Sequence, residues 1–147
     1  MNTHTDPRTR VLHTDDQLRD MIDLLLQKAD IRQMWLMFID QNGCLGDPIM
    51  PMADYPRDPF EIVSADDLGE VAHSHLLMRR AEEIREAIGN AQIVLVWERR
   101  GGEKLRDDEL TWARAMAEQA ADQGVPLRAQ FVLHSGGARQ LHADDYL

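Results

Sequence analysis

The sequence contains a single cysteine, Cys44, among its 147 residues. A lone thiol excludes an internal disulfide framework and any zinc site built from several cysteines, so we expect a reducing, cytoplasmic setting. Long apolar runs are also missing, since the longest stretches, such as residues 34–39, are far shorter than a membrane span. The N-terminus is polar, and we therefore expect neither a signal peptide nor a membrane anchor.

Positive charge is scarce as well. The chain carries 16 Lys and Arg against 26 Asp and Glu, which gives a formal net charge of −10. An acidic surface repels a phosphate backbone, so nucleic acid is an unlikely type of partner on charge grounds alone. The length suits one domain with an ordinary hydrophobic core. We expect a flexible arm over residues 1–13 and a single domain over residues 14–147.

Three segments carry the signals of helices. Thr14, with a glutamine three residues later, has the spacing of a capping box, and apolar residues at one-face spacing follow it. A capping residue at the start and a glycine after the end predict the bounds of each of the other two helices. The expected helices cover residues 14–29, 64–88 and 107–123.

Short apolar segments bounded by turn residues predict the strands. The expected strands cover residues 32–39, 44–50, 92–97, 127–133 and 138–141. Four prolines between Pro48 and Pro59 predict a surface loop there. The order α-β-β-α-β-α-β-β predicts an α/β fold, with a mixed central sheet of about five strands flanked by three helices.

The loop before the third predicted helix is the strongest candidate for binding chemistry. It combines three cations and two glycines, namely Arg99, Arg100, Gly101, Gly102 and Lys104. Side chains and helix N–H groups could together meet an anion there. Against this, the spacing matches neither common phosphate-binding motif, and acidic residues 107–109 occupy the helix start that a phosphate would need.

The other chemically active side chains have ordinary interpretations. His73 and His75 lie two residues apart, so on a helix they point about 200° apart and cannot share one zinc ion. Cys44 has no catalytic signature around it, and Ser135 does not lie in a nucleophile-elbow motif. We therefore assign no catalytic residue, no metal and no cofactor.

From about Gln33 to Leu141, the order of elements resembles the RadC-like members of the JAB/MPN metalloprotease superfamily. Residues 38–45 resemble the first hairpin of that family, and residues 93–102 resemble the strand and loop that carry its metal ligands. Residues 124–127 resemble the entry to the strand after the last helix. The resemblance implies a JAB-like scaffold.

The resemblance does not bring the zinc site with it. The positions that correspond to the family's catalytic glutamate, two histidines and Ser-x-x-Asp pair are Arg32 or Gln33, Trp97, Arg99, Arg106 and Glu109. A guanidinium group cannot ligate zinc. Trp97, Arg99 and Glu109 are therefore expected to mark a degenerate metal site. Trp97 could face either layer of the fold, and its burial tests whether a tryptophan fills the space of the metal.

Two function hypotheses follow. The first is a non-catalytic, metal-free JAB/RadC-like domain that serves as a protein-interaction or regulatory module. Its partner, another protein or a second copy of the chain, would bind at the loop 50–60 or at the arm 1–13. The alternative is a domain, enzyme or not, that binds a small anionic ligand or nucleotide through the loop 99–102. A link to nucleic acid rests only on the DNA-repair association of RadC proteins, and the net charge opposes it.

Overall fold

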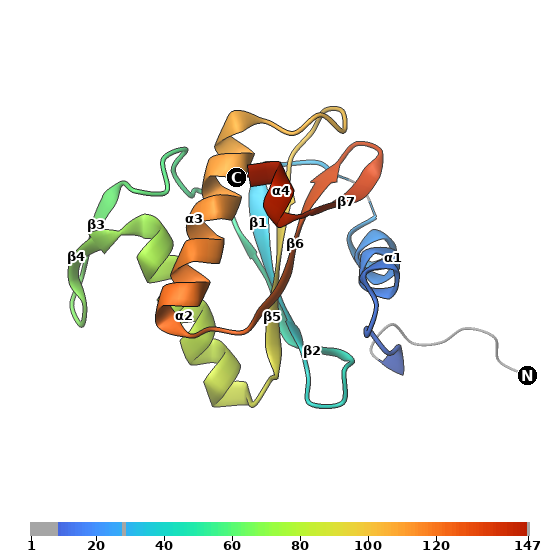
Figure 1. The fold of residues 1–147 in the computed structure, drawn as a ribbon, viewed down its shortest axis with the longest axis horizontal. Helices are drawn as coiled ribbons and strands as arrows, with labels where there is room; N and C mark the ends of the chain where they lie inside the picture. Colours follow the sequence, from blue (N-terminus) through green and yellow to red (C-terminus); the bar gives the residue numbers. More distant parts are fainter. Residues whose placement is uncertain (1–8, 28, 147) are drawn as a thin grey trace, which may run out of the picture.

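A computed structural model describes residues 9–27 and 29–146 of the chain (Figure 1). The described helices are α1 (Asp15–Leu26), α2 (His73–Ile88), α3 (Asp107–Gln123) and α4 (Ala143–Tyr146). The described strands are β1 (Gln33–Ile39), β2 (Leu45–Met52), β3 (Ile62–Ala65), β4 (Gly69–Ala72), β5 (Gln92–Glu98), β6 (Leu127–His134) and β7 (Gly137–Leu141). None of these helices is long and apolar enough to cross a membrane.

The main sheet has the strand order β2-β1-β5-β6-β7. Its central pair, β5 and β6, is parallel and is connected through α3, whereas the other neighbouring pairs are antiparallel. The prediction of an α/β fold with a mixed sheet of about five strands is confirmed. The short helix α4 lies in the segment that the sequence analysis left as an acidic tail.

The two faces of the sheet are covered by different helices. Figure 1 shows α2 and α3 on one side and α1 on the other. A hydrophobic core lies on each side of the sheet, and alternate side chains of β5 point into one or the other. Ile93, Leu95 and Trp97 pack in the core on the α2–α3 side, while Val94 and Val96 pack in the core on the α1 side. This period of two is why the strand is apolar along its whole length.

The second predicted helix begins nine residues too early. Residues 64–72 are not helical, because β3 and β4 form a hairpin and α2 begins only at His73. Gly69, the first residue of β4, has a φ of +72°, a conformation that a right-handed helix does not contain. Ser64, where the predicted helix begins, lies in β3, and Asp66 and Asp67 lie in the hairpin turn. Arg80 of α2 donates to the Asp67 carboxylate at 2.7 Å.

The predicted proline loop was also wrong in its first part, since β2 continues to Met52. Pro48 and Pro51 are tolerated because β2 is an edge strand, where a missing N–H need not break a ladder. In the predicted arm, residues 1–8 lie outside the described part of the chain. Leu12 is buried, and its backbone N–H donates to the Gly43 carbonyl at 2.8 Å.

Candidate functional site

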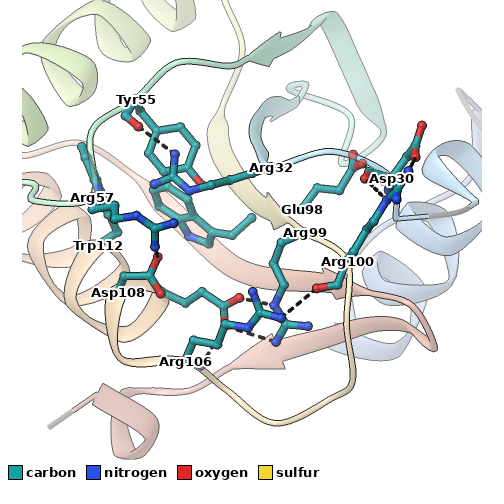
Figure 2. Close-up of a pocket in the computed structure, with 12 residues that line it drawn as sticks. Asp30, Arg32, Tyr55, Arg57, Glu98, Arg99, Arg100, Arg106, Asp108 and Trp112 are labelled. Carbon is teal, nitrogen blue, oxygen red and sulfur yellow. Dashed lines mark hydrogen bonds and ion pairs between the residues drawn. The ribbon is translucent and has the colours of Figure 1, made fainter.

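A pocket of about 350 Å³ opens where several chain segments leave the same edge of the sheet (Figure 2). Gln33 pairs with Glu98, so the segment before β1 lies beside the carboxyl end of β5. Met52 pairs with Met34, so the loop after β2 emerges at that edge as well. The start of α3 completes the pocket. Open α/β sheets commonly bind ligands at the carboxyl ends of their strands.

Three aromatic side chains form the base of the pocket. Tyr55 meets Trp97 and Trp112 edge to face, with ring centroids 5.5 and 5.4 Å apart, and the two indoles are 5.6 Å apart. Both tryptophans are buried, and Trp97 faces the α2–α3 side of the sheet. The Trp97 indole N–H donates to the Gln130 side chain at 3.0 Å, and the Trp112 indole N–H donates to the Pro56 carbonyl at 2.7 Å. The base is therefore a packed layer with satisfied polar groups.

Arg32 fixes the loop that forms one wall of the pocket. Its guanidinium donates to the backbone carbonyls of Tyr55 at 2.7 Å and Pro56 at 3.3 Å. It also lies over the Tyr55 ring, 3.8 Å from the centroid, in a cation–π arrangement. Burial raises the pKa of Tyr55 to about 12, so this phenol stays neutral over the whole physiological range.

A buried ion pair closes the inner end of the pocket. The side chains of Arg99 and Glu109 are 6% and 8% exposed, and Nε of the arginine donates to the carboxylate. The same guanidinium donates to the carbonyls of Gly102 and of Lys104, the latter at 2.8 Å. Glu109 also accepts from the backbone N–H of Arg106 at 3.0 Å. The pair therefore joins the end of β5, the loop after it and the first turn of α3.

Glu98 is the second buried carboxylate, and its partners are all neutral. It accepts from the backbone N–H groups of Asp30 at 2.7 Å and Ile31 at 3.0 Å. It also accepts from the Gln33 amide at 3.0 Å and the Trp35 indole at 2.7 Å. Burial alone would raise the pKa of Glu98, but these hydrogen bonds outweigh it and lower the pKa below its usual value. The ionised group holds the segment before β1 in place.

The outer rim carries more exposed arginines. The side chain of Arg57 is 81% exposed and lies 3.4 Å from the Asp108 carboxylate. That of Arg100 is 76% exposed and donates to both the carbonyl and the carboxylate of Asp30, each at 2.7 Å. Arg106 donates to the Arg100 carbonyl at 3.0 Å. Figure 2 shows the side chains of Arg57, Arg100 and Arg106 at different positions around the pocket.

The loop residues predicted to hold an anion do not form one cradle. Arg99 and Arg100 line the pocket, but Gly102 and Lys104 line a separate depression of about 360 Å³. Gly101 has a φ of +111°, and a Cβ atom there would lie only 2.5 Å from the guanidinium of Arg106. This glycine therefore permits the close approach of an arginine.

The positions that the family resemblance aligns with a metal site do come together. Arg32, Trp97, Arg99, Arg106 and Glu109 line this pocket, whereas Gln33, the other candidate for the glutamate position, does not. The five lining residues come from two separate parts of the sequence, residue 32 and residues 97–109. Within the part of the chain that the structure describes, no group of three or more His, Cys, Asp or Glu side chains could hold a metal ion.

Sequence reasoning missed Tyr55 and Arg57 as pocket residues, because both lie in a segment interpreted only as a proline-rich surface loop. The available signal was an aromatic residue and an arginine placed between prolines, where the backbone is stiff. Sequence alone does not reveal that Trp112 and Arg32 fix this loop against the end of β5.

The remaining candidates lie elsewhere and do not converge. His73 packs edge to face on Trp112, and burial lowers its pKa, while His75 lies 3.1 Å from the side-chain oxygen of Gln119. Ser135 accepts a hydrogen bond from the Gly101 N–H at 3.0 Å, which connects two loops. These contacts are structural.

Comparisons with known proteins give no assignment. No protein-family profile matches the chain, and no curated protein is significantly similar to it.

Proposed function

We propose that this chain is a non-catalytic, metal-free domain with a JAB/RadC-like order of elements, and that it serves as a protein-interaction or regulatory module. The observation that carries the proposal is the buried ion pair between Arg99 and Glu109. By the resemblance, both residues stand at positions of the metal site. The only carboxylate of the degenerate site is thus held by a guanidinium, which cannot itself ligate a metal.

The cost of breaking the buried ion pair opposes metal binding at this site. A metal that recruited Glu109 would take the carboxylate away from Arg99 and leave a buried cation without its partner. Breaking a buried pair in this way costs about 3–5 kcal/mol. The same break would loosen the first turn of α3, since Glu109 also accepts from the backbone of Arg106.

The hairpin of β3 and β4 supports the interaction role. Its two strands pair only with each other in the described structure, and Figure 1 shows them at the far side of α2 from the main sheet. Phe60 and Ile62, at its entry, are 54% and 62% exposed. Exposed apolar side chains beside open strand edges are typical of a surface that another protein covers.

A zinc titration tests the metal-free half of the proposal. We expect calorimetry with Zn²⁺ to show no saturable stoichiometric binding to the wild-type chain. Tight binding of one zinc ion per chain, lost in Glu109→Gln, would disprove it. A weak signal that Glu109→Gln leaves unchanged would place any zinc outside this pocket and leave the claim intact.

Sedimentation velocity tests the interaction half with the chain as its own partner. We expect concentration-dependent self-association that is weakened when Phe60 and Ile62 are both changed to Ser. Ile88→Ser is the matched control, because Ile88 is similarly exposed at the C-terminal end of α2. Association that Ile88→Ser weakens equally would contradict an interface at the hairpin.

The alternative from the sequence, an anion clamp formed by the loop 99–102, has weaker support. Its central side chain, Arg99, already binds the Glu109 carboxylate and two loop carbonyls. An anion held by this loop would have to displace that buried pair.

A further inference from the structure

We propose that the pocket at the carboxyl end of β5 binds a small molecule that carries one carboxylate or phosphate group on an apolar or aromatic body. Arg106 and Arg57 hold the anion, and the body lies against Tyr55. This ligand site goes beyond the interaction role proposed above, and it uses a different set of arginines from the loop 99–102.

The charge of the pocket selects an anion. Five arginines and four carboxylates line it, so its formal charge is +1 on a chain whose net charge is −10. The carboxylates of Asp30, Asp108 and Glu109 each face an arginine, and Glu98 is satisfied by neutral donors. Two of the three acidic residues in the first turn of α3, Asp108 and Glu109, are therefore compensated within the pocket, and the third, Asp107, does not line it.

Two arginines remain without a carboxylate partner among the described residues. Arg32 and Arg106 make their hydrogen bonds to backbone carbonyls, which leave the positive charge of each guanidinium in place. Arg32 is not available to a ligand, since it binds the backbone of Tyr55 and Pro56 in the wall of the pocket. Arg106, at the N-cap of α3, has donors left for a ligand.

Arg57 is the second anion-binding group. Its contact with Asp108 is long, at 3.4 Å, and its side chain is 81% exposed. The Asp108 side chain is 28% exposed, but a long contact made by so exposed an arginine contributes little stability, so exchanging it for a ligand carboxylate or phosphate costs little. A guanidinium binds either group in a bidentate manner, which is why the two anions are one chemical class here.

Size and lining define the rest of the ligand. A volume of about 350 Å³ lies at the lower end of the range for small-molecule sites, so a single ring with its anionic group suits it. Tyr55 is partly exposed above the two buried tryptophans, and its neutral phenol offers an apolar surface. The wall is preorganised because Arg32 and Trp112 already hold the loop backbone.

The test uses three probes with the same ring, namely benzoate, phenyl phosphate and the neutral benzamide, together with inorganic phosphate. Trp97 and Trp112 are two of the three tryptophans, so intrinsic fluorescence reports on the pocket. We expect saturable binding of benzoate or phenyl phosphate, weakened by added salt, and at least tenfold weaker binding of benzamide. The tighter of the two anions identifies the ligand group.

Arg106→Gln and Arg57→Gln should each weaken binding of the better anion about tenfold, which corresponds to about 1.4 kcal/mol. Arg114→Gln is the matched control, because Arg114 is exposed on the same helix, pairs with Glu118 and lies outside the pocket. Its affinity should equal that of the wild type. A thermal melt of each variant confirms that it is folded.

Three results would overturn the proposal. They are the absence of saturable binding of both anions at millimolar concentration, equal binding of benzamide, and unchanged affinity in the folded Arg57 and Arg106 variants. Inorganic phosphate that binds as tightly as phenyl phosphate would overturn the role given to Tyr55. The zinc titration is independent, so failure of the metal-free proposal and failure of this one are separate outcomes.

Discussion

Two adjacent arginines at the end of β5 divide this site into an inner and an outer region. Arg99 is buried and pairs with the buried Glu109, whereas Arg100 is exposed and pairs with the exposed Asp30. The two pairs have the same chemistry. They differ in solvent access, and solvent access decides whether a pair is a structural requirement or an adjustable contact.

The same difference in solvent access separates the residues that hold the pocket in shape from those that face a ligand. The inner region, with its two buried carboxylates, holds the loop after β5 and the segment before β1 in place. The outer region presents arginines whose present partners are a carbonyl, for Arg106, or the partly exposed Asp108 carboxylate, for Arg57. We infer that ligand or partner chemistry belongs to the rim, and that the inner ion pair maintains its shape.

The largest expected effect is on the inner pair. Arg99→Met removes the guanidinium and leaves the Glu109 carboxylate buried without its partner. We expect the free energy of unfolding, measured with urea, to fall by about 3–5 kcal/mol. A double variant with Glu109→Leu as well should recover much of that loss. A loss below about 1 kcal/mol in Arg99→Met would mean that the pair behaves like a surface contact.

Glu98→Gln should have the next largest effect. It replaces an ionised acceptor with an amide, and hydrogen bonds to charged groups are worth about 1.5–3 kcal/mol, so we expect a loss of that order at pH 7. The pKa of Glu98 is lowered in the folded chain, so its charge stabilises the fold above the unfolded value of 4.5.

The pH dependence provides the check on Glu98. Its contribution is lost as the pH falls below 4.5 and through the lower folded pKa. The difference in unfolding free energy between the wild type and Glu98→Gln should therefore shrink on acidification. A difference that stays constant from pH 7 to pH 3 would show that the charge of Glu98 contributes nothing.

The smallest effect is expected on the outer pair. Arg100→Ala removes an exposed contact with Asp30, and such pairs are typically worth 0–1 kcal/mol. We expect a loss of less than about 1 kcal/mol in urea unfolding, and high salt should abolish most of it. A loss as large as that of Arg99→Met would remove the distinction between the two regions.

Much of the fold follows from local patterns. The capping box at Thr14 forms as predicted, and Gly89 and Gly124 adopt the left-handed conformation at the ends of α2 and α3. The apolar segments became strands because their side chains can be buried on both faces of one sheet. The hairpin of β3 and β4 was missed, since a Ser-Ala-Asp-Asp sequence fits a helix start and a hairpin turn equally well.

The site was less accessible from sequence. The resemblance aligned five positions with a metal centre, and the structure places these five residues around one pocket. Their closeness in space does not by itself establish a relationship to the family. In the anion-binding alternative the loop 99–104 would act as a unit, but Arg99 is buried against Glu109 while Lys104 lines another depression. Burial of Arg99 depends on the packing that places Glu109, ten residues further along the chain, against the end of β5, and the loop sequence does not contain that information.

The sequence by itself determined the five strands of the main sheet, the helices α1 and α3 and the end of α2, because these depend on side-chain periodicity and on residues that cap or end a helix. Tertiary structure alone decided which of two neighbouring arginines is buried and which segments form the pocket. Those outcomes depend on the packing of α3 and of the loop after β2 against the end of β5, which brings Glu109 to Arg99 and Tyr55 to Trp97.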